Sequence, residues 1–165
     1  MPGIDENLPF HPLNIAVLTV SDTRTMATDT SGALLAERLT AAGHNLAARA
    51  IVTDDVEVIR DQMRAWIADR AVDIVVSTGG TGFAPRDQTP EGTRLVIERE
   101  APGLAEAMRL ISPLGRLSRG IAGIRGDAIV CNTPGSPKGC VEQLGAILDV
   151  LPHALRLLHD RPTAH

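Results

Sequence analysis

The chain has 165 residues, of which 44% are hydrophobic and 22% are charged, so we expect one compact domain that is neither disordered nor fibrous. Sixteen Lys and Arg against 20 Asp and Glu give a net charge of −4, which argues against nucleic acid as a partner. With two Phe, one Trp and no Tyr, the chain also lacks an aromatic platform on which bases or ligand rings could stack.

The N-terminus and the cysteines indicate a cytoplasmic protein. Residues 1–11 lack the apolar stretch of a targeting peptide, and we expect them to form a flexible segment before a single domain over 12–165. Since no apolar run approaches the length of a membrane span, a membrane is not an expected partner. Cys131 and Cys140 form no CxxC and have no paired histidines, so we expect buried, reduced thiols rather than a zinc site.

In the first half of the chain, strands and helices are predicted to alternate. The β-branched run Asn14–Val20 predicts a strand buried on both faces. Thr30 or Ser31 is expected to cap the next helix, which stops at Gly43. A strand over 46–52, a helix to about residue 69 and a strand over 72–77 follow.

The second half continues this alternation. Thr89 is the expected N-cap of a helix that Pro102-Gly103 interrupts. Two short strands over 120–132 predict a hairpin at the sheet edge, and the chain closes with a helix through Leu151 and a last stretch after Pro152. The predicted fold class is therefore α/β, a three-layer α/β/α domain with a mainly parallel sheet and a binding crevice at the carboxyl ends of its strands.

A glycine-rich turn after the third predicted strand is the strongest functional signal. Its glycines let backbone N–H groups converge on an anion, and the helix start behind it adds a favourable dipole. Arginine there can neutralise phosphate, and aspartate can hold the magnesium that accompanies a nucleotide. The motif is neither a Walker A loop nor GxGxxG. We interpret as a phosphate site the residues Thr78, Gly79, Gly80, Thr81, Gly82, Arg86 and Asp87.

For the other turns, the sequence does not decide between a functional and a structural role. Asp54-Asp55 could bind a cation together with Asp87 or could serve as a helix N-cap pair. Pro134-Gly-Ser-Pro137 with Lys138 could admit a ligand to the backbone or simply start a helix. For the loop that contains Ser21, Asp22 and residues 29–32, helix capping is the favoured interpretation. A solvated helix face is the expected place of four arginines, of which one or two could reach phosphate: Arg109, Arg116, Arg119 and Arg125.

Eight segments together resemble the MoaB/Mog family of molybdenum-cofactor biosynthesis, and the similarity runs from about residue 12 to residue 159. The combination of GGTG with RDxTPE is the most specific part of it. The segments are Leu18-Thr-Val-Ser-Asp22, Asp29-Thr-Ser-Gly32, Ala42-Gly-His44, Ile51-Val-Thr-Asp54, Thr78-Gly-Gly-Thr-Gly82, Arg86-Asp-Gln-Thr-Pro-Glu91, Pro102-Gly103 and Pro134-Gly-Ser-Pro-Lys138.

The resemblance implies a molybdopterin-binding domain that assembles as a homotrimer or a hexamer. The implied activity is magnesium-dependent transfer of an adenylyl group from ATP to molybdopterin, with release of pyrophosphate. The alternative within the same pathway is a non-catalytic molybdopterin-binding or scaffold protein. By motif position, Asp54 and Asp87 match the essential, metal-holding acidic residues, although Asp55 leaves the register of the first open by one position. The remaining matches are substrate contacts: Gly79, Gly80 and Gly82 in the phosphate turn, Thr78, Thr81 and Arg86 around it, Ser136, and Ser21 with Asp22.

Overall fold

A single six-stranded sheet organises the computed structural model, which describes residues 7–160. The order of strands in it is β2-β1-β3-β6-β5-β4. The first four of these run parallel, whereas β5 is antiparallel to β6 and β4 is antiparallel to β5. The strands are β1 (Asn14–Val20), β2 (Asn45–Val52), β3 (Ile74–Thr78), β4 (Arg99–Glu100), β5 (Ala122–Arg125) and β6 (Ala128–Thr133).

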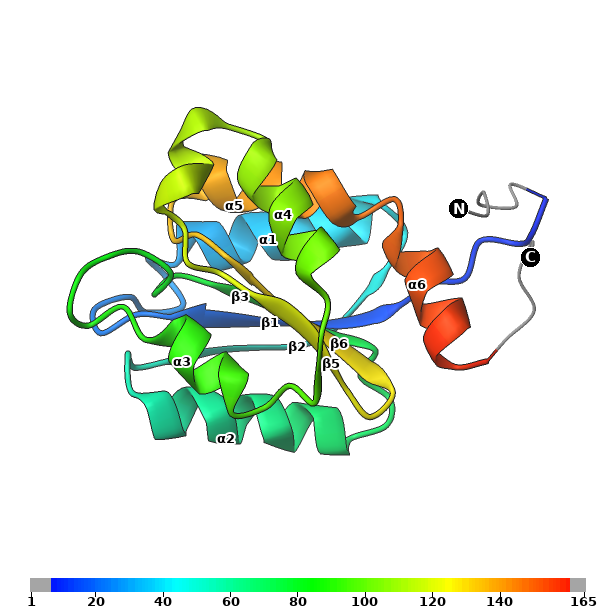
Figure 1. Cartoon of the computed structure of the whole chain (residues 1–165), viewed down its shortest axis with the longest axis horizontal. Helices are drawn as coiled ribbons and strands as arrows, with labels where there is room; N and C mark the ends of the chain where they lie inside the picture. Colours follow the sequence, from blue (N-terminus) through cyan, green and yellow to red (C-terminus); the bar gives the residue numbers. More distant parts are fainter. Residues whose placement is uncertain (1–6, 161–165) are drawn as a thin grey trace.

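Helices cover both faces of the sheet, so the predicted three-layer α/β/α class is confirmed (Figure 1). One face carries α1 (Thr30–Ala41), α4 (Pro102–Leu110) and α5 (Pro137–Ile147). The other carries α2 (Val56–Ala68) and α3 (Thr89–Arg94). A short 3-10 helix, η1 (Pro113–Leu117), follows α4, and α6 (Leu151–Leu158) ends the described chain.

Strand β1 supplies both hydrophobic cores, as its β-branched sequence predicts. Ile15 and Val17 belong to the cluster that includes Leu35 of α1 and Leu144 of α5. Alternate side chains of the strand, such as Leu18, belong to the cluster that includes residues of α2. Because successive side chains of a strand point to opposite faces, one run of apolar residues anchors both helical layers.

Two helix starts differ from the sequence prediction. Asp29, not Thr30 or Ser31, caps α1, since its Oδ1 accepts a hydrogen bond from the Gly32 amide at 3.0 Å. Ser31 lies inside the helix, where its hydroxyl donates to the Gly135 carbonyl at 2.7 Å. At α3 the N-cap position belongs to Gln88, and Thr89 is already helical. Ser31 and Thr89 both use their hydroxyls in tertiary contacts, so neither hydroxyl caps its helix.

The segment around Pro102 also differs. Helix α3 ends at Arg94, so Pro102-Gly103 does not interrupt it and instead begins α4. Between them the chain turns into β4, because the Glu98 and Ala101 amides bond to carbonyls of β5. The predicted hairpin of β5 and β6 is confirmed, but β6 pairs with β3 inside the sheet and the short β4 forms the edge. Near the C-terminus α5 stops at Ile147, and Leu151 belongs to α6.

Both cysteines are buried free thiols, as expected. Burial raises the pKa of Cys131 to about 12 and also raises the pKa of Cys140. Among residues 7–160, none of the helices combines the length and the apolar character needed to cross a bilayer. Residues 1–6 of the segment expected to be flexible lie outside the described residues. Within the rest of that segment, the Phe10 ring lies beside the His44 ring, with 5.2 Å between the ring centroids.

Candidate functional site

Two adjoining pockets open where β1, β2, β3 and β6 end. We call the first, of about 400 Å³, the aspartate cleft. Its lining includes the predicted residues Ser21, Asp22, Asp54, Thr78, Gly79, Gly80 and Asp87. The second, of about 630 Å³, is the PGSP pocket, which Thr81, Gly82 and Ser136 line together with residues of η1 and α5. Gly80, Asp87 and Gly135 line both, so a ligand with two parts could occupy them together.

Backbone conformation and close packing require glycine at two positions of the turn after β3. Gly79 has φ +96° and Gly80 has φ +70°, a region that residues with a Cβ rarely adopt. A Cβ on Gly79 would lie 2.4 Å from the Val20 carbonyl oxygen, and one on Gly80 would lie 2.2 Å from Thr89 Oγ1. The sequence motif therefore reflects a turn that is packed tightly against its neighbours.

The turn directs its carbonyl groups toward the protein and leaves amides available. Thr89 holds it closed, since its hydroxyl donates to the Gly79 carbonyl at 2.8 Å and its amide to the Gly80 carbonyl at 3.0 Å. By contrast, no group in the described part of the chain accepts from the amides of Gly80, Thr81 and Gly82. Three successive free N–H groups beside a pocket are the donors that a phosphate needs.

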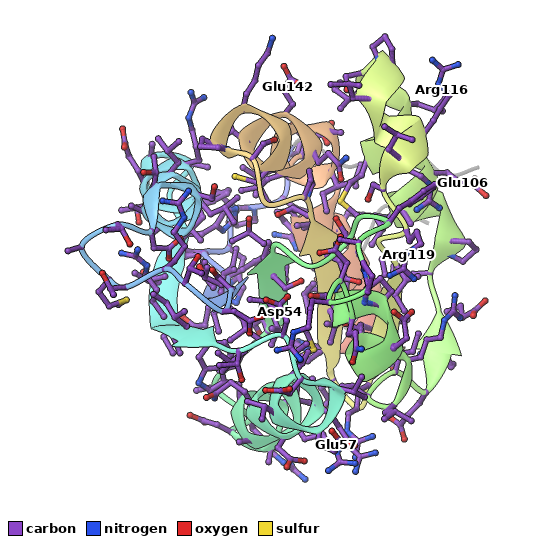
Figure 2. All side chains as sticks on the ribbon, turned by 90° about the vertical axis from the view of Figure 1, so that its left-hand side faces the viewer. Asp54, Glu57, Glu106, Arg116, Arg119 and Glu142 are labelled. Atoms are coloured by element: carbon purple, nitrogen blue, oxygen red, sulfur yellow. The ribbon has the colours of Figure 1, made fainter. Side chains whose placement is uncertain are left out.

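Four aspartates line the aspartate cleft: Asp22, Asp29, Asp54 and Asp87. Asp54 is only 8% exposed, and its pKa is raised by burial and by the negative charges of Asp22 and Asp87. Figure 2 looks onto the carboxyl ends of the strands and shows Asp54 near the middle of that end. The Asp87 carboxylate is fixed by the Ala84 amide, which donates to Oδ2 at 3.0 Å. A cation in this cleft would relieve the mutual repulsion of these groups.

The structure separates the roles of the two adjacent aspartates. Asp54 lines the cleft, whereas Asp55 occupies the N-cap position of α2 and accepts a hydrogen bond from the Thr53 hydroxyl at 2.6 Å. Of the two, Asp54 therefore has the geometry of a ligand-binding carboxylate. The structure thus brings together Asp22, Asp54 and Asp87 from the loops that follow β1, β2 and β3.

The aspartate carboxylates of the cleft fit the magnesium that the resemblance implies. Among residues 7–160 no preformed group of three or more His, Cys, Asp or Glu could hold a metal ion alone. Magnesium, however, is usually bound by one or two carboxylates with substrate phosphates and water completing its shell. Asp54 and Asp87 would be those carboxylates, because both line the cleft together with Gly80, whose amide is free.

Arg86 is already paired in this structure and lines neither of the two pockets. Its guanidinium donates to both carboxylate oxygens of Asp22, at 2.8 and 3.0 Å, and to Asp55 Oδ1 at 3.4 Å. The hydrogen bonds to Asp22 raise the pKa of Arg86, so it stays charged. To contact a phosphate, this arginine would have to leave Asp22, which would free that carboxylate.

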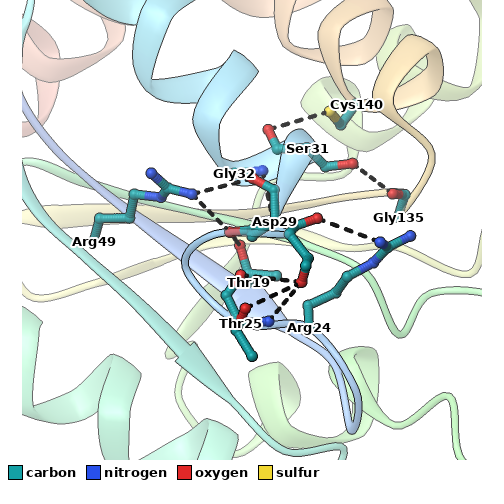
Figure 3. A network of polar contacts seen from close by, with 10 residues as sticks. Thr19, Arg24, Thr25, Asp29, Ser31, Gly32, Arg49, Gly135 and Cys140 are labelled. Carbon is teal, nitrogen blue, oxygen red and sulfur yellow. Dashed lines mark hydrogen bonds and ion pairs between the residues drawn. The ribbon is translucent and has the colours of Figure 1, made fainter.

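A polar network in the wall of the cleft fixes the loop after β1 (Figure 3). Asp29 Oδ2 accepts from the Thr19 hydroxyl at 2.6 Å and from Arg49 at 3.1 Å. Burial favours the neutral acid, but the hydrogen bonds from Thr19, Gly32 and Arg49 outweigh it and lower the pKa of Asp29. Asp29 is thus an ionised, buried anchor for the wall of the cleft.

The Pro134–Pro137 loop starts a helix, as one of the two predicted roles has it, and also lines a pocket, while contact with a ligand stays a prediction. Ser136 caps α5 by accepting from the Gly139 amide at 3.1 Å, while its exposed side chain lines the PGSP pocket. The Thr78 hydroxyl donates to the Pro134 carbonyl at 2.7 Å. This bond joins the ends of β3 and β6 beside the glycine turn.

Sequence patterns did not reveal every residue of the site. Arg24 lines the aspartate cleft, and residues between Ser112 and Ser118 form one wall of the PGSP pocket. Arg119, expected on a solvated face, instead contacts the glycine turn and Glu91. Neither of these two pockets has Phe or Trp in its lining, so a ligand ring there would be held without aromatic stacking, in keeping with the scarcity of rings in the sequence.

Comparisons with known proteins agree with this geometry. Residues 16–153 match the family described as a probable molybdopterin binding domain. Molybdenum cofactor biosynthesis protein B of Escherichia coli K12 is 40% identical over 136 residues, which cover 79% of this chain and 80% of that protein. The Drosophila melanogaster cofactor synthesis protein cinnamon is 39% identical, and the match covers 90% of this chain but only 26% of that longer protein. The crystal structure of the molybdopterin biosynthesis enzyme MoaB from Thermus thermophilus superposes with a TM-score of 0.84 at 43% identity, covering 91% of this chain and 98% of that one.

Proposed function

Because the chain belongs to the molybdopterin-binding domain family of the MoaB and Mog proteins of molybdenum cofactor biosynthesis, we propose that it adenylylates molybdopterin. An oxygen of the terminal phosphate of molybdopterin attacks the α-phosphorus of ATP. The bond from that phosphorus to the bridging oxygen of the β-phosphate breaks, and the electron pair leaves with pyrophosphate. The product is adenylyl-molybdopterin.

The residues of the aspartate cleft suit this step because phosphoryl-type transfer depends on positioning and charge stabilisation more than on covalent catalysis. The free amides of Gly80, Thr81 and Gly82 would bind phosphate oxygens. Asp54 and Asp87 would hold magnesium, which supplies the positive charge that two phosphorylated substrates need to approach each other. The guanidinium of Arg86 would leave Asp22 and contact a phosphate as the substrates bind.

The two joined pockets match a reaction with two large substrates. The aspartate cleft has the carboxylates and Gly80, whereas Thr81 and Gly82 line the adjoining PGSP pocket, so the reacting phosphates would lie where the two pockets meet. The PGSP pocket has walls of proline and leucine together with Ser136 and Lys138, which suits a heterocyclic ring with polar edges. Asp87 lines both pockets and stands where the two substrates would meet.

The observation that carries the proposal is the row of free amides beside Asp54 and Asp87. Incubation of the protein with molybdopterin, ATP and magnesium should release pyrophosphate, and Asp87→Asn should abolish that release. Asp61→Asn is the matched control, because Asp61 pairs with its neighbour Arg60 on the exposed side of α2. Full activity of Asp87→Asn would refute the role of this carboxylate. Binding of molybdopterin without turnover would favour the non-catalytic alternative.

We further propose that the chain acts in the cytoplasm as a homotrimer or a hexamer. Four large apolar side chains lie exposed at the end of α4 and on η1, and Leu110 alone is 84% exposed. Exposed apolar side chains that lie this close together commonly mark a protein interface. The four residues are Leu110, Ile111, Leu114 and Leu117, of which the last two also line the PGSP pocket, so the interface would lie against that pocket.

Light scattering tests the assembly directly. The wild type should have the mass of three or six chains, and Leu110→Glu should shift it toward the monomer. Leu157→Glu is the control, because Leu157 lies exposed on α6, away from the four residues. A monomeric wild type at micromolar concentration would refute the proposal.

A further inference from the structure

Arg119 binds the loop that carries Asp87 at several points. Its own amide donates to the Thr81 carbonyl at 2.7 Å. Its guanidinium donates to the carbonyls of Gly82 and Asp87, both at 2.7 Å, and to the two carboxylate oxygens of Glu91 at 2.9 and 3.1 Å. One residue therefore contacts both ends and the middle of the segment from Thr81 to Glu91.

These contacts replace the regular hydrogen bonds that the loop lacks. Within the described residues, the loop itself contributes the bond from the Asp87 amide to the Ala84 carbonyl at 2.9 Å and the bond from the Ala84 amide to Asp87 Oδ2. The planar guanidinium presents its donors in a fixed fork, so it sets the spacing of the carbonyls that it binds. In Figure 2 Arg119 lies at the strand-end face that also holds Asp54.

The other arginines expected beside it have different roles. Arg116 bonds to the Pro113 carbonyl within its own 3-10 helix, and Arg125 bonds to the Val96 carbonyl. Arg109 holds the Gly120 carbonyl at the base of the segment that carries Arg119. Of these four, Arg119 alone is hydrogen-bonded to the residues between the glycine turn and α3.

We propose that Arg119 is a positioning residue for Asp87: together with Glu91 it fixes the loop so that the Asp87 carboxylate faces Asp54 across the cleft. Arg119 does not line either pocket, and its charge is already matched by Glu91. The catalytic part of this inference rests on the proposed adenylyltransfer, whereas the structural part does not. The arrangement also gives the glutamate of the RDxTPE motif a role beyond its favourable place at the start of a helix.

The experiment compares Arg119→Ala, Arg119→Lys and Glu91→Gln with the control Arg125→Ala, since Arg125 also donates to a backbone carbonyl but lines neither pocket. Hydrogen exchange of the Ala84 and Asp87 amides reports on the loop without any substrate, and we expect about tenfold faster exchange in Arg119→Ala. In turnover, a misplaced Asp87 should lower kcat by about 10²-fold and raise the magnesium concentration that gives half-maximal rate. Loss of folded protein would reduce the rate but would leave that concentration unchanged.

The conservative variants keep the inference testable if Arg119→Ala does not fold. Lysine keeps the positive charge but not the forked set of donors. Arg119→Lys should therefore show faster exchange of the loop amides and a higher magnesium requirement, both more weakly than Arg119→Ala, and so should Glu91→Gln. Wild-type exchange and wild-type magnesium dependence in these two variants would overturn the inference. Altered exchange in a protein whose wild type releases no pyrophosphate would refute the adenylyltransfer and leave the structural role of Arg119 intact.

Discussion

Replacing Gly80 with alanine tests how tightly the glycine turn is held. The new Cβ would lie 2.2 Å from Thr89 Oγ1, so the threonine hydroxyl must move and lose its bond to the Gly79 carbonyl. The positive φ costs an L-residue about 1–2 kcal/mol. A lost buried hydrogen bond costs about 1 kcal/mol more, and up to about 3 kcal/mol if the carbonyl stays unpaired. We expect Gly80→Ala to lower the free energy of unfolding by about 2–5 kcal/mol.

Gly126→Ala separates the two contributions. Gly126 has φ +55°, but a Cβ there would meet nothing within 4 Å, so this variant carries only the conformational cost. The effect of the substitution on the unfolded chain is the same in both variants and cancels in the comparison. Urea denaturation of the two variants should therefore differ by about 1–3 kcal/mol, the packing part of the cost.

Thermal unfolding and turnover complete this assay. For a domain of this size, 1 kcal/mol corresponds to about 2–4 °C in Tm, so Gly80→Ala should melt roughly 4–20 °C below the wild type. Pyrophosphate release should fall as well, since the displaced Thr89 no longer fixes the free amides. If Gly80→Ala proved no less stable than Gly126→Ala, the reasoning that the turn is closed by Thr89 would be wrong.

Three further predictions concern titratable groups. The lowered pKa of Asp29 stabilises the fold above pH 3.8, the ordinary value, and this stabilisation is lost as the pH falls through the lower folded pKa. Thr19→Val removes one of the hydrogen bonds that lower this pKa and should therefore reduce the stabilisation. Urea denaturation at pH 7 should show a loss of about 1 kcal/mol in the free energy of unfolding. The raised pKa of Asp54 means that its ionisation opposes folding. Asp54→Asn should therefore be more stable than the wild type at pH 7 in urea denaturation, yet inactive. Equal or lower stability of this variant would contradict the crowding of negative charge in the cleft. Cys131 and Cys140 should react with a thiol reagent at pH 8 only after unfolding, and rapid labelling of either in the native protein would contradict their burial.

Local patterns in the sequence predicted the fold well wherever neighbouring residues decide the structure. The β-branched run of β1 and the glycines after β3 are such cases, because strand burial and positive φ follow from the residues themselves. The start of α1 is different. Asp29, Thr30 and Ser31 are all good caps, and the contacts of Asp29 with Thr19 and Arg49 determine which of them caps the helix. Those partners come from the strands β1 and β2, which the local sequence around residue 29 does not include.

In the candidate site, too, the sequence predicts some features and not others. The convergence of Asp22, Asp54 and Asp87 follows from the rule that parallel strands end at one edge, so their loops could be predicted to meet. The contact of Arg119 with Glu91 joins residues 28 apart, and that of Arg86 with Asp22 joins residues 64 apart. No spacing in the sequence predicts these pairs, since each depends on how two loops are packed.

The glycine turn carries its chemistry in the main chain, and this affects how the site must be mapped. Its amides lie beside the pocket, and Thr89 and Arg119 bind its carbonyls from behind. Conventional alanine scanning removes side chains and would leave such donors in place, so the proposed phosphate contacts of these amides would go undetected in that screen. Replacing single amides of Gly80, Thr81 and Gly82 by esters, through chemical synthesis or suppressor-based incorporation of hydroxy acids, would measure each contact separately.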